Sequence, residues 1–421
     1  MVKGITIFLL LLSFNMFGQD NVVAEVLIQG NKRTKSSFVK KIIQVKEGFA
    51  LDSVLLKEDI VLLKRLPSIS NATFKVYYEE KDFKGVKVIY TLEENFTLIP
   101  YANLFTSSND DFAYRIGLQE FNVLGRNIIS GVFYQKDIYS SYGVNLRIPY
   151  LFGRKWGLTL NYSNLTTQEP VFFNSATADY KYNNESFEIL ALHEFNTANG
   201  VAFGLNFFTE DYSYLFGITS AEVPQQLKVN KYLYKLIYDY DRINYHYQYL
   251  SGFRSRLNLQ YVHSMDENLP DFVIGFNDFM HYSRHGERGN WASRLRLGMA
   301  SNVKTPFAPF TVDNNINIRG VGNTIDRGTA AIVLNTEFRY SLVDKDWFVL
   351  QGNVFVDAGT WRNPGGTLED FLDQENLRVY PGIGLRFMHK RIFNAIFRID
   401  YGYGITKNAS KGIVFGIGQY F

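Results

Sequence analysis

The stretch WGLTLNYSN, residues 156–164, decides the fold class because its apolar and polar residues alternate. Successive side chains of a β-strand point to opposite faces, so one face of this strand is apolar and the other carries small polar residues. Residues 142–150 repeat the pattern, and residues 396–401 place Arg398 and Asp400 on the polar face. A soluble core would not tolerate those charges, whereas a membrane barrel has lipid outside and a polar lumen inside. The alternation therefore predicts a mainly β protein with a transmembrane barrel.

Turn signals between the alternating segments predict sixteen antiparallel strands of about ten residues each. The expected strand starts are Phe96, Asp111, Asn127, Tyr142, Lys155, Tyr180, Gly200, Val229, Gly252, Asp271, Asn290, Gly328, Trp347, Val379, Phe393 and Gly412. Two classes of connection alternate, short ones as at 123–126 and 151–154, and long ones as at 166–179, 212–228, 301–327 and 360–378. Short periplasmic turns and longer surface loops are typical of an outer-membrane barrel. Because the connection 241–251 is long for its place, fourteen strands is the alternative count.

The chain opens with the features of a secretory signal peptide. Lys3 precedes an apolar run over residues 5–17, and the polar residues Gln19 and Asp20 follow it. The run is too short for a helix that crosses a bilayer of ~30 Å. We therefore expect residues 1–19 to be removed on export; a buried first helix is the alternative. The run is followed by no cysteine, which excludes a lipoprotein anchor.

Residues 22–95 are predicted to form a small domain of their own, ahead of a barrel domain over residues 96–421. A strand pattern ends at Gly30, and two apolar stripes at helical spacing follow, the second of which stops at Pro67. Two more strands are expected at 72–79 and 86–93. The order strand, helix, helix, strand, strand predicts one α+β module with a single small core.

Four pieces of this module carry a resemblance to a known family. They are IQGN at residues 28–31, KEG at 46–48, LL at 62–63 and VIYTLEE at 88–94. Together they resemble a POTRA module, the periplasmic unit that precedes the barrel in the bacterial surface antigen family of outer-membrane assembly proteins. A module of this kind offers strand edges that can take up an extended client by β-augmentation. The alternative is that the module is only a spacer.

The C-terminal part of the chain carries a second resemblance. Its motifs are NIRGVG at residues 317–322, FVDAG at 355–359, PGIGLRF at 381–387, RIDYG at 398–402 and FGIGQYF at 415–421. This ordered set resembles the barrel of the same family, whose members include the insertase of the barrel-assembly machinery and the two-partner secretion transporters. The first motif departs from the family at Val321, where the family has an aromatic residue, so the packing of the loop tip is expected to differ.

The resemblance implies a specific contact inside the lumen. Alternation along the strands that contain Glu337 and Asp357 sends both carboxylates inward. The resemblance implies that the long loop folds back into the lumen and that Arg319 meets Asp357, with Glu337 beside it; Gly320 and Gly359 belong to the same motifs. A guanidinium between two carboxylates would pin the loop by charge-assisted bonds. The alternative is a solvated Arg319.

The two strands that close the barrel are predicted to be poor partners. Pro100 in the first strand has no N–H for the ladder, and the last strand, expected to end at Phe421, contains Gly412, Gly416 and Gly418. In an insertase of the family this closing pair opens to template client strands, and the resemblance implies the same seam here. The alternative is that the glycines only relieve curvature at the closure.

Composition excludes several other functions. The chain has 44 basic and 41 acidic residues, so it presents no field for nucleic acid. It has no cysteine, which excludes thiolate catalysis, disulfides and cysteine-bound metals. His281 and His285 have no acidic cluster beside them, and no hydrolase, zinc-protease or nucleotide motif occurs. We expect no catalytic residues, no metal and no cofactor.

These patterns predict an outer-membrane protein, with its module in the periplasm, that assembles or inserts outer-membrane proteins, or translocates polypeptide, through a laterally gated barrel. The expected partners are outer-membrane lipid, unfolded outer-membrane or secreted polypeptides, and periplasmic accessory proteins. Two alternatives stay open. A two-partner-type secretion transporter is less favoured because no plug helix precedes the single module. A passive structural or pore-forming barrel would fit a chain with so few modules.

Overall fold

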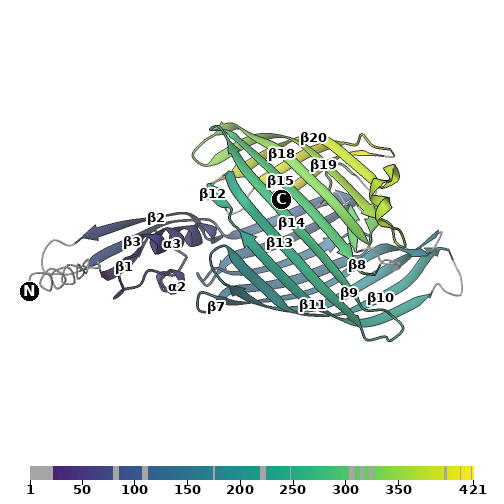
Figure 1. The fold of residues 1–421 in the computed structure, drawn as a ribbon, viewed down its shortest axis with the longest axis horizontal. Helices are drawn as coiled ribbons and strands as arrows, with labels where there is room; N and C mark the ends of the chain where they lie inside the picture. The colour runs from purple at the N-terminus through teal and green to yellow at the C-terminus, as the bar shows by residue number, and fades with distance from the viewer. Residues whose placement is uncertain are drawn as a thin grey trace, which may run out of the picture.

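A computed structural model of the 421-residue chain describes residues 22–78, 85–106, 112–173, 176–218, 224–246, 248–302, 309–312, 317–321, 326–392, 396–407, 409–418 and 420–421. The predicted signal peptide, residues 1–19, lies outside these described residues. Two units follow one another along the chain, a small N-terminal module and a large barrel (Figure 1). No helix in the described ranges is long and apolar enough to cross a membrane.

The N-terminal module is a three-stranded sheet with two helices. In chain order it contains β1 (Val23–Gln29), α2 (Ser36–Ile42), α3 (Ser53–Arg65), β2 (Ile69–Tyr78) and β3 (Val86–Glu94). The central strand β3 runs parallel to β1 and antiparallel to β2. Asp52 begins α3 by accepting a hydrogen bond from the N–H of Val54, as good N-cap residues do. Apolar side chains of both helices are buried with those of the sheet, including Phe38, Val39, Ile42, Leu56, Leu63, Val88 and Tyr90.

Sixteen antiparallel strands form the barrel, so the predicted count is confirmed. They are β4 (Leu98–Thr106), β5 (Phe112–Val123), β6 (Ile128–Lys136), β7 (Ser140–Phe152), β8 (Trp156–Phe173), β9 (Ala176–Glu194), β10 (Asn199–Gly217), β11 (Gln226–Asp241), β13 (Tyr249–Ser264), β14 (Phe272–His285), β15 (Gly289–Ala300), β18 (Ala330–Asp344), β19 (Phe348–Arg362), β20 (Leu377–His389), β21 (Ile396–Tyr403) and β22 (Lys411–Ile417). The last strand, β22, lies beside the first, β4, and closes the ring. A short extra strand, β12 (Asn244–His246), pairs with β13. This strand accounts for the length of the connection 241–251.

The two faces of the barrel wall differ as the alternation predicts. Outward residues such as Leu334 and Val354 are apolar and exposed, at 45% and 56% of their surface. Inward residues such as Asn335 and Asp357 are polar and completely buried. An exposed apolar band around a polar interior is the surface of a barrel that spans a membrane.

Strands β8 to β11 are longer than expected, and the predicted loops at 166–179 and 212–228 are largely strand. An aromatic row crosses the outer face of these strands through paired residues, Tyr162, Phe187, Phe207 and Tyr232. Beyond this row the outward residues turn polar, as at Glu185, while the inward residues Tyr180 and Tyr212 are buried. The apolar face therefore changes sides where the strands leave the lipid, which is why the alternation of the outer face no longer indicated a strand.

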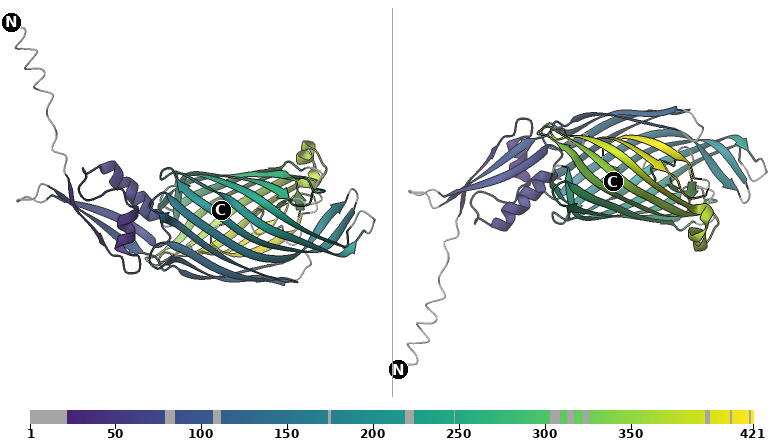
Figure 2. Two further views of the ribbon diagram at one scale, coloured as in Figure 1. Left: turned by 90° about the horizontal axis from the view of Figure 1, so that it is seen from below. Right: turned by 90° about the horizontal axis from the view of Figure 1, so that it is seen from above.

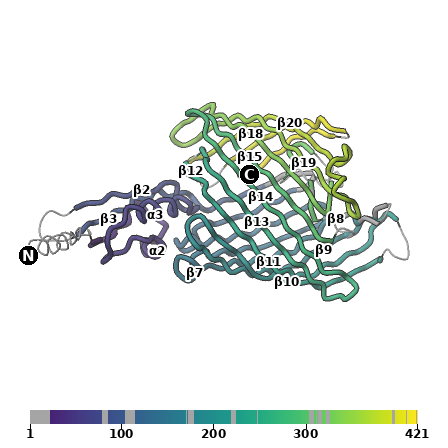
Figure 3. Tube along the Cα trace, in the orientation of Figure 1, coloured from purple at the N-terminus to yellow at the C-terminus, as the bar shows by residue number. Residues whose placement is uncertain are grey.

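The long connection after β15 returns along the inside of the barrel. Its described pieces are β16 (Phe310–Val312), which pairs with β17 (Asp326–Gly328), and residues 317–321 between them. A second connection, after β19, contains two short 3-10 helices, η1 (Leu368–Leu372) and η2 (Gln374–Asn376). Figure 3 traces the chain through the module and along the tilted strands of the barrel.

The module and η1 lie at opposite ends of the barrel. Figure 2 shows the module at one end of the barrel and the longer strand extensions at the other. The module leads into the start of β4, so it lies at the end where β5–β6, β7–β8 and β9–β10 are joined by short turns. The last strand of the module ends at Glu94 and the first barrel strand begins at Leu98, so only residues 95–97 link the two units.

Candidate functional site

Residues 317–321 of the long loop lie inside the lumen and form the centre of the candidate site. Ile318, Arg319 and Val321 are completely buried. Gly320 has φ +94°, a conformation that glycine adopts without strain and that lets the loop turn back. Val321 belongs to an apolar cluster with Trp361, which occupies part of the space around the loop tip.

Arg319 and Asp357 are joined by three hydrogen bonds. The Nε of Arg319 donates to Oδ2 of Asp357 at 2.8 Å, and Nη2 donates to Oδ1 at 2.9 Å. The backbone N–H of Arg319 adds a bond of 2.9 Å to Oδ2. Both side chains are fully buried. Bidentate, charge-assisted bonds of this kind fix the orientation of the guanidinium as well as its position.

Glu337 gathers three arginines beside this pair. It accepts hydrogen bonds from Nη1 of Arg319 at 2.6 Å, from Nε of Arg339 at 2.5 Å and from Nη2 of Arg386 at 2.7 Å. All of these side chains are fully buried. The loop arginine is therefore held by β18 through Glu337 and by β19 through Asp357.

A third acid extends the network to β21. Oδ1 of Asp400 lies 3.6 Å from Nη1 of Arg319, and Oδ2 accepts a hydrogen bond of 3.0 Å from Arg398. Asn353 of β19 donates to the same carboxylate at 3.1 Å. We call the charged set the lumen cluster; its members are Arg319, Glu337, Arg339, Asp357, Arg386, Arg398 and Asp400.

The main effect of the lumen cluster is to fix the position of the loop. Its contribution to the free energy of unfolding is small. Desolvation of buried charges offsets much of their mutual attraction, so an intact buried pair contributes little net stability. Removal of one partner leaves an uncompensated buried charge and costs about 3–5 kcal/mol. Any other placement of the loop would leave Asp357 and Glu337 without Arg319, and such placements are therefore disfavoured.

Two aromatic rings lie against Arg319. Its guanidinium carbon is 3.6 Å from the ring centroid of Phe355 and 4.6 Å from that of Tyr420. Phe355 lies in the FVDAG motif, two residues before Asp357, so the alternation that sends Asp357 inward sends it inward too. Tyr420 is a residue that the sequence reasoning did not assign to this site, and no pattern around it signalled this contact.

Glycines allow the loop to pack directly on the barrel wall. A Cβ on Gly402 would overlap the carbonyl oxygen of Arg319, and a Cβ on Gly320 would lie 2.7 Å from the Cα of Gly402. A Cβ on Gly412 would make only an ordinary contact, 3.4 Å, with the carbonyl oxygen of Gly320. A Cβ on Gly359 would lie 2.8 Å from the side chain of Ile318. Gly320 and Gly402 thus let backbone meet backbone inside the lumen, and Gly359 leaves room for the side chain of Ile318.

The seam residues are placed differently from the prediction in two respects. The last strand does not run to Phe421, because β22 ends at Ile417 and Gly418 follows with φ +95°. Phe421 lies in the lumen, its ring 5.7 Å from the guanidinium carbon of Arg339. A Cβ on Gly416 would lie 2.5 Å from Nη2 of Arg398, so this glycine makes room for the lumen cluster.

Pro100 does lie in the closing strand β4, where it pairs with Leu118 of β5 and is exposed on the outer surface. Gly412 and Gly416 lie on the other side of the closure, in β22. The absence of a side chain at Gly416 thus serves a contact inside the lumen, which neither reading of the sequence anticipated.

The module is tied to the barrel by hydrogen bonds that three of its basic side chains donate. Arg33 donates to Thr97 at 3.1 Å and to Glu120 at 3.0 Å. Lys41 donates to the carbonyl oxygen of Tyr150 at 3.0 Å. Arg65, the last residue of α3, donates to the carbonyl oxygens of Thr197 and Asp241, the latter at 2.9 Å.

Glu94 holds the end of β3 to the loop that precedes α2. Its carboxylate accepts hydrogen bonds from the backbone N–H groups of Lys32, Arg33 and Thr34. Burial opposes ionisation of Glu94, but these hydrogen bonds outweigh it and hold its pKa below the usual value. The same loop contacts the barrel through Arg33, so Glu94 supports the junction indirectly.

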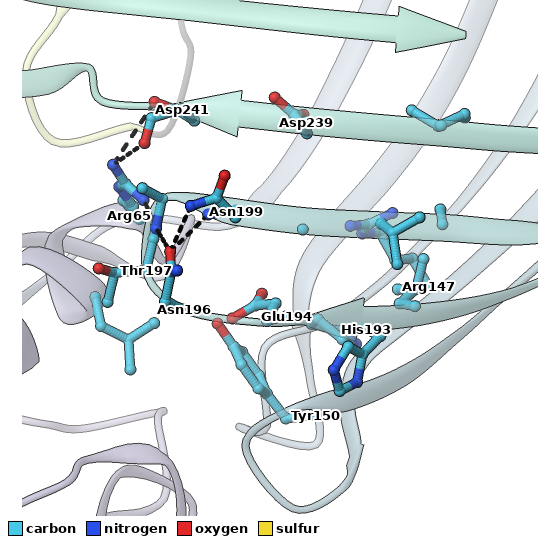
Figure 4. A pocket seen from close by; sticks show the side chains of 18 of the residues that line it. Arg65, Arg147, Tyr150, His193, Glu194, Asn196, Thr197, Asn199, Asp239 and Asp241 are labelled. Atoms are coloured by element: carbon cyan, nitrogen blue, oxygen red, sulfur yellow. Dashed lines mark hydrogen bonds and ion pairs between the residues drawn. The ribbon is translucent and has the colours of Figure 1, made fainter. Parts of the chain in front are cut away.

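A cavity of about 310 Å³ lies between α3 and the mouth of the barrel. Leu62 of α3 and Leu66, the residue after α3, form part of its lining, and Arg147, Glu194 and Asp239 form part of the barrel side. Figure 4 shows Arg65 and Asp241 pointing toward one another at its edge. The C-terminal turn of α3 therefore lies over the entrance to the lumen, with the cavity between them.

No group of three or more histidine and acidic side chains suitable for a metal occurs in the described ranges. The acids of the lumen cluster all face arginines, which occupy the positions that a cation would need. This cluster can hold a polypeptide loop by charge pairing, but it does not fit a metal ion.

No protein-family model and no curated protein matches the chain. Solved structures do match its fold. BamA from Haemophilus ducreyi lacking POTRA domains 1-3 has 16% identity and a TM-score of 0.57, over 95% of this chain and 84% of that chain. CdiB from Acinetobacter baumannii has 14% identity and a TM-score of 0.61, over 95% and 74% of the two chains.

CdiB from Escherichia coli is similar as well, with 11% identity and a TM-score of 0.63, over 94% of this chain and 76% of that chain. The chain therefore shares the fold of the BamA and CdiB barrels, a sixteen-stranded barrel. At these identities the likeness concerns the fold.

Proposed function

We propose that the protein resides in the outer membrane, with its module in the periplasm, and inserts or assembles polypeptides there by opening the seam between β22 and β4. One observation carries this proposal: β22, with seven residues, is the shortest of the sixteen strands and is the strand that closes the ring. The fold shared with BamA and CdiB supports the same reading, since those barrels belong to outer-membrane assembly and two-partner secretion.

Strand length argues that the barrel opens at the seam. β22 has seven residues and β4 has nine, which limits the ladder that these two strands can share at the seam. By contrast, β9 and β10 have 19 residues each. Each paired residue adds ladder hydrogen bonds, so a short strand is released at a lower free-energy cost than a long one. A client strand could then pair with the edge that opening exposes.

The module offers one strand edge for a client. The outer edge of β1 is occupied by its own chain, because the N–H of Val26 donates to Glu47 at 3.0 Å and the N–H of Gly48 donates to the carbonyl oxygen of Val23 at 2.8 Å. The opposite edge of the sheet is β2. Tyr77 and Tyr78 on β2 are 48% and 64% exposed. An extended polypeptide could add to β2 by β-augmentation.

The filled lumen argues against a passive pore. Residues 317–321 and the lumen cluster occupy its interior, and their charged side chains are buried. Ions would have to pass a loop that Arg319 holds by several buried bonds. The same feature makes a secretion transporter the second candidate, because a chain that passes through the lumen would have to take the space that this loop occupies.

The proposal is tested by reconstitution. The purified protein is placed in liposomes, and the folding of a urea-denatured outer-membrane barrel into these liposomes is followed by its heat-modifiable mobility. We expect the client to fold faster than in protein-free liposomes. We also expect each copy of this protein to fold more than one client molecule. Lys75→Pro, a variant in β2, should slow this reaction, because proline has no backbone N–H and bends the strand that is proposed to take up the client.

Two outcomes would contradict the proposal. If the client folds no faster than in liposomes that contain an unrelated barrel of similar size, the protein is not an insertase. If, in addition, planar bilayers show steady channels with the wild-type protein, the passive pore becomes the better reading. The matched control for Lys75→Pro is Lys75→Ala, which keeps the backbone N–H at this position.

A further inference from the structure

We infer that Tyr420 couples the seam strand to the lumen loop, so that β22 cannot leave β4 without loosening Arg319. The use of this coupling in the cell rests on the proposed function. The coupling itself is a property of the folded barrel, and its test measures no assembly activity.

The chain turns back into the lumen directly after β22. Gly418 has φ +95°, and its N–H donates to the carbonyl oxygen of Ile396 at 2.8 Å. Tyr420 is 7% exposed, and its ring centroid is 4.6 Å from the guanidinium carbon of Arg319 and 4.8 Å from that of Arg398. A residue that follows the seam strand is thus seated against the arginine that holds the loop.

The beginning of β22 touches the same loop. Ser410, the residue before β22, donates its hydroxyl to the carbonyl oxygens of Val321 and, at 3.4 Å, Gly320. Gly412 faces the backbone of Gly320, as described above. The loop therefore contacts residues at both ends of β22. Ser410 and Gly412 lie at its start, and Tyr420 follows its end.

These contacts make seam and loop respond together. An outward movement of β22 would carry Ser410 and Gly412 away from Gly320, and it would withdraw Tyr420 from Arg319 unless Gly418 absorbed the whole displacement. Conversely, release of Arg319 would remove the nearest of the cations that Tyr420 contacts in a water-poor site and leave Arg398 in place. Coupling between two sites is reciprocal, so a change at either one must appear at the other by the same factor.

The experiment uses the full-length protein in detergent micelles with Val321→Cys as its single cysteine. Val321 is completely buried, and the chain has no other cysteine. The rate at which a water-soluble maleimide labels Cys at this position reports the opening of the loop. Hydrogen exchange of residues 411–417 reports the opening of the seam strand in the same samples.

We expect Tyr420→Ala to raise the labelling rate and the exchange of β22 together, each by roughly five- to thirty-fold, the range that a desolvated cation–π contact supports. Tyr420→Phe, which keeps the ring, should remain near wild type. Phe415→Ala is the matched control, because it removes an aromatic ring from β22 that points outward and is 52% exposed. It should leave the labelling of the loop unchanged.

Arg319→Ala supplies the reciprocal test. It should raise the exchange of β22, and the double variant with Tyr420→Ala should exchange more slowly than the product of the two single effects predicts, because both single variants lose the same Arg319–Tyr420 contact. The inference is overturned if Tyr420→Ala leaves both readouts at wild type, or if the two substitutions add. Heat-modifiable mobility shows that each variant is folded. Failure of the liposome assay described above would not affect either result.

Discussion

The carbonyl oxygen of Arg319 packs directly on Gly402, in the space that a Cβ on this glycine would fill. The loop that carries Arg319 is thus held twice, by its guanidinium in the lumen cluster and by its backbone on β21. The second contact depends on shape alone and is independent of charge.

Substitution of Gly402 by alanine tests the backbone contact. The new methyl group would overlap the carbonyl oxygen of Arg319, so the loop or β21 must shift, at a cost of about 1–3 kcal/mol for overpacking. We expect a lower midpoint of thermal unfolding, measured by heat-modifiable mobility. Gly352→Ala is the control, since its Cβ would lie 3.4 Å from Leu342, an ordinary contact. Equal midpoints for the two variants would show that the loop does not rest on Gly402.

Substitution of Arg319 tests the charged contact. Arg319→Ala leaves Asp357 and Glu337 without their shared partner and should cost about 3–5 kcal/mol where the lumen is dry. Arg319→Lys should lose less, because it keeps the charge, but it cannot form the bidentate bond. Urea unfolding in micelles measures both. The double variant with Asp357→Ala should lose less than the sum of the two single losses, and strict additivity would argue that the two residues do not interact.

The strand count could be predicted because lipid outside and polar residues inside give every strand the same period of two. The largest error in a predicted strand start is four residues, Tyr180 against Ala176. It occurs where β9 extends beyond the lipid, because Tyr180 there faces inward and the outer face is polar. An assignment that depends on an apolar outer face misses such a segment.

The partners of Arg319 on β18 and β19 could be proposed because Glu337 and Asp357 lie on strands whose alternation points them inward. Tyr420 could not, because it follows a strand and its position depends on the turn at Gly418. The role of Gly416 was missed for a related reason. Glycine in a strand signals that something lies close, but the sequence does not show whether it is a neighbouring strand, a curved wall or a loop.

Arg65 is predicted to hold α3 against the barrel. Arg65→Ala removes its hydrogen bonds to the carbonyl oxygens of Thr197 and Asp241. A hydrogen bond from a charged donor contributes about 1.5–3 kcal/mol. We expect a broader distance distribution between spin labels at positions 57 and 345, measured by pulsed electron paramagnetic resonance. Lys64→Ala, at the neighbouring position, is the control. A distribution as narrow as in the wild type would mean that the other contacts suffice.

Glu94 makes the module junction sensitive to acid. Its pKa is lowered in the folded protein, so its stabilisation is present above the unfolded pKa of about 4.3 and is lost as the pH falls through the folded pKa. The amides of Lys32, Arg33 and Thr34 should therefore lose protection from hydrogen exchange at acid pH, after correction for intrinsic rates. Glu94→Gln should show low protection that does not depend on pH. A pH-dependent loss that persists in Glu94→Gln would assign the effect to another group.

The last prediction concerns the seam and separates an insertase from a passive barrel. Cysteines at facing positions of β4 and β22 should form a disulfide that locks the closure, and assignment is simple because the chain has no native cysteine. If clients enter through the seam, the oxidised protein should lose the liposome folding activity while keeping its heat-modifiable barrel, and reduction should restore it.

The matched control places the disulfide on the other side of β22, between Ile399 and Phe415, which are paired in register on β21 and β22. This bond tethers β22 to β21 and leaves the seam able to open, so activity should survive oxidation. Loss of activity in the seam variant alone identifies the seam as the route. If the locked seam supports client folding at the wild-type rate, lateral opening is not the mechanism. The short closing strand β22 would then have no role as a gate.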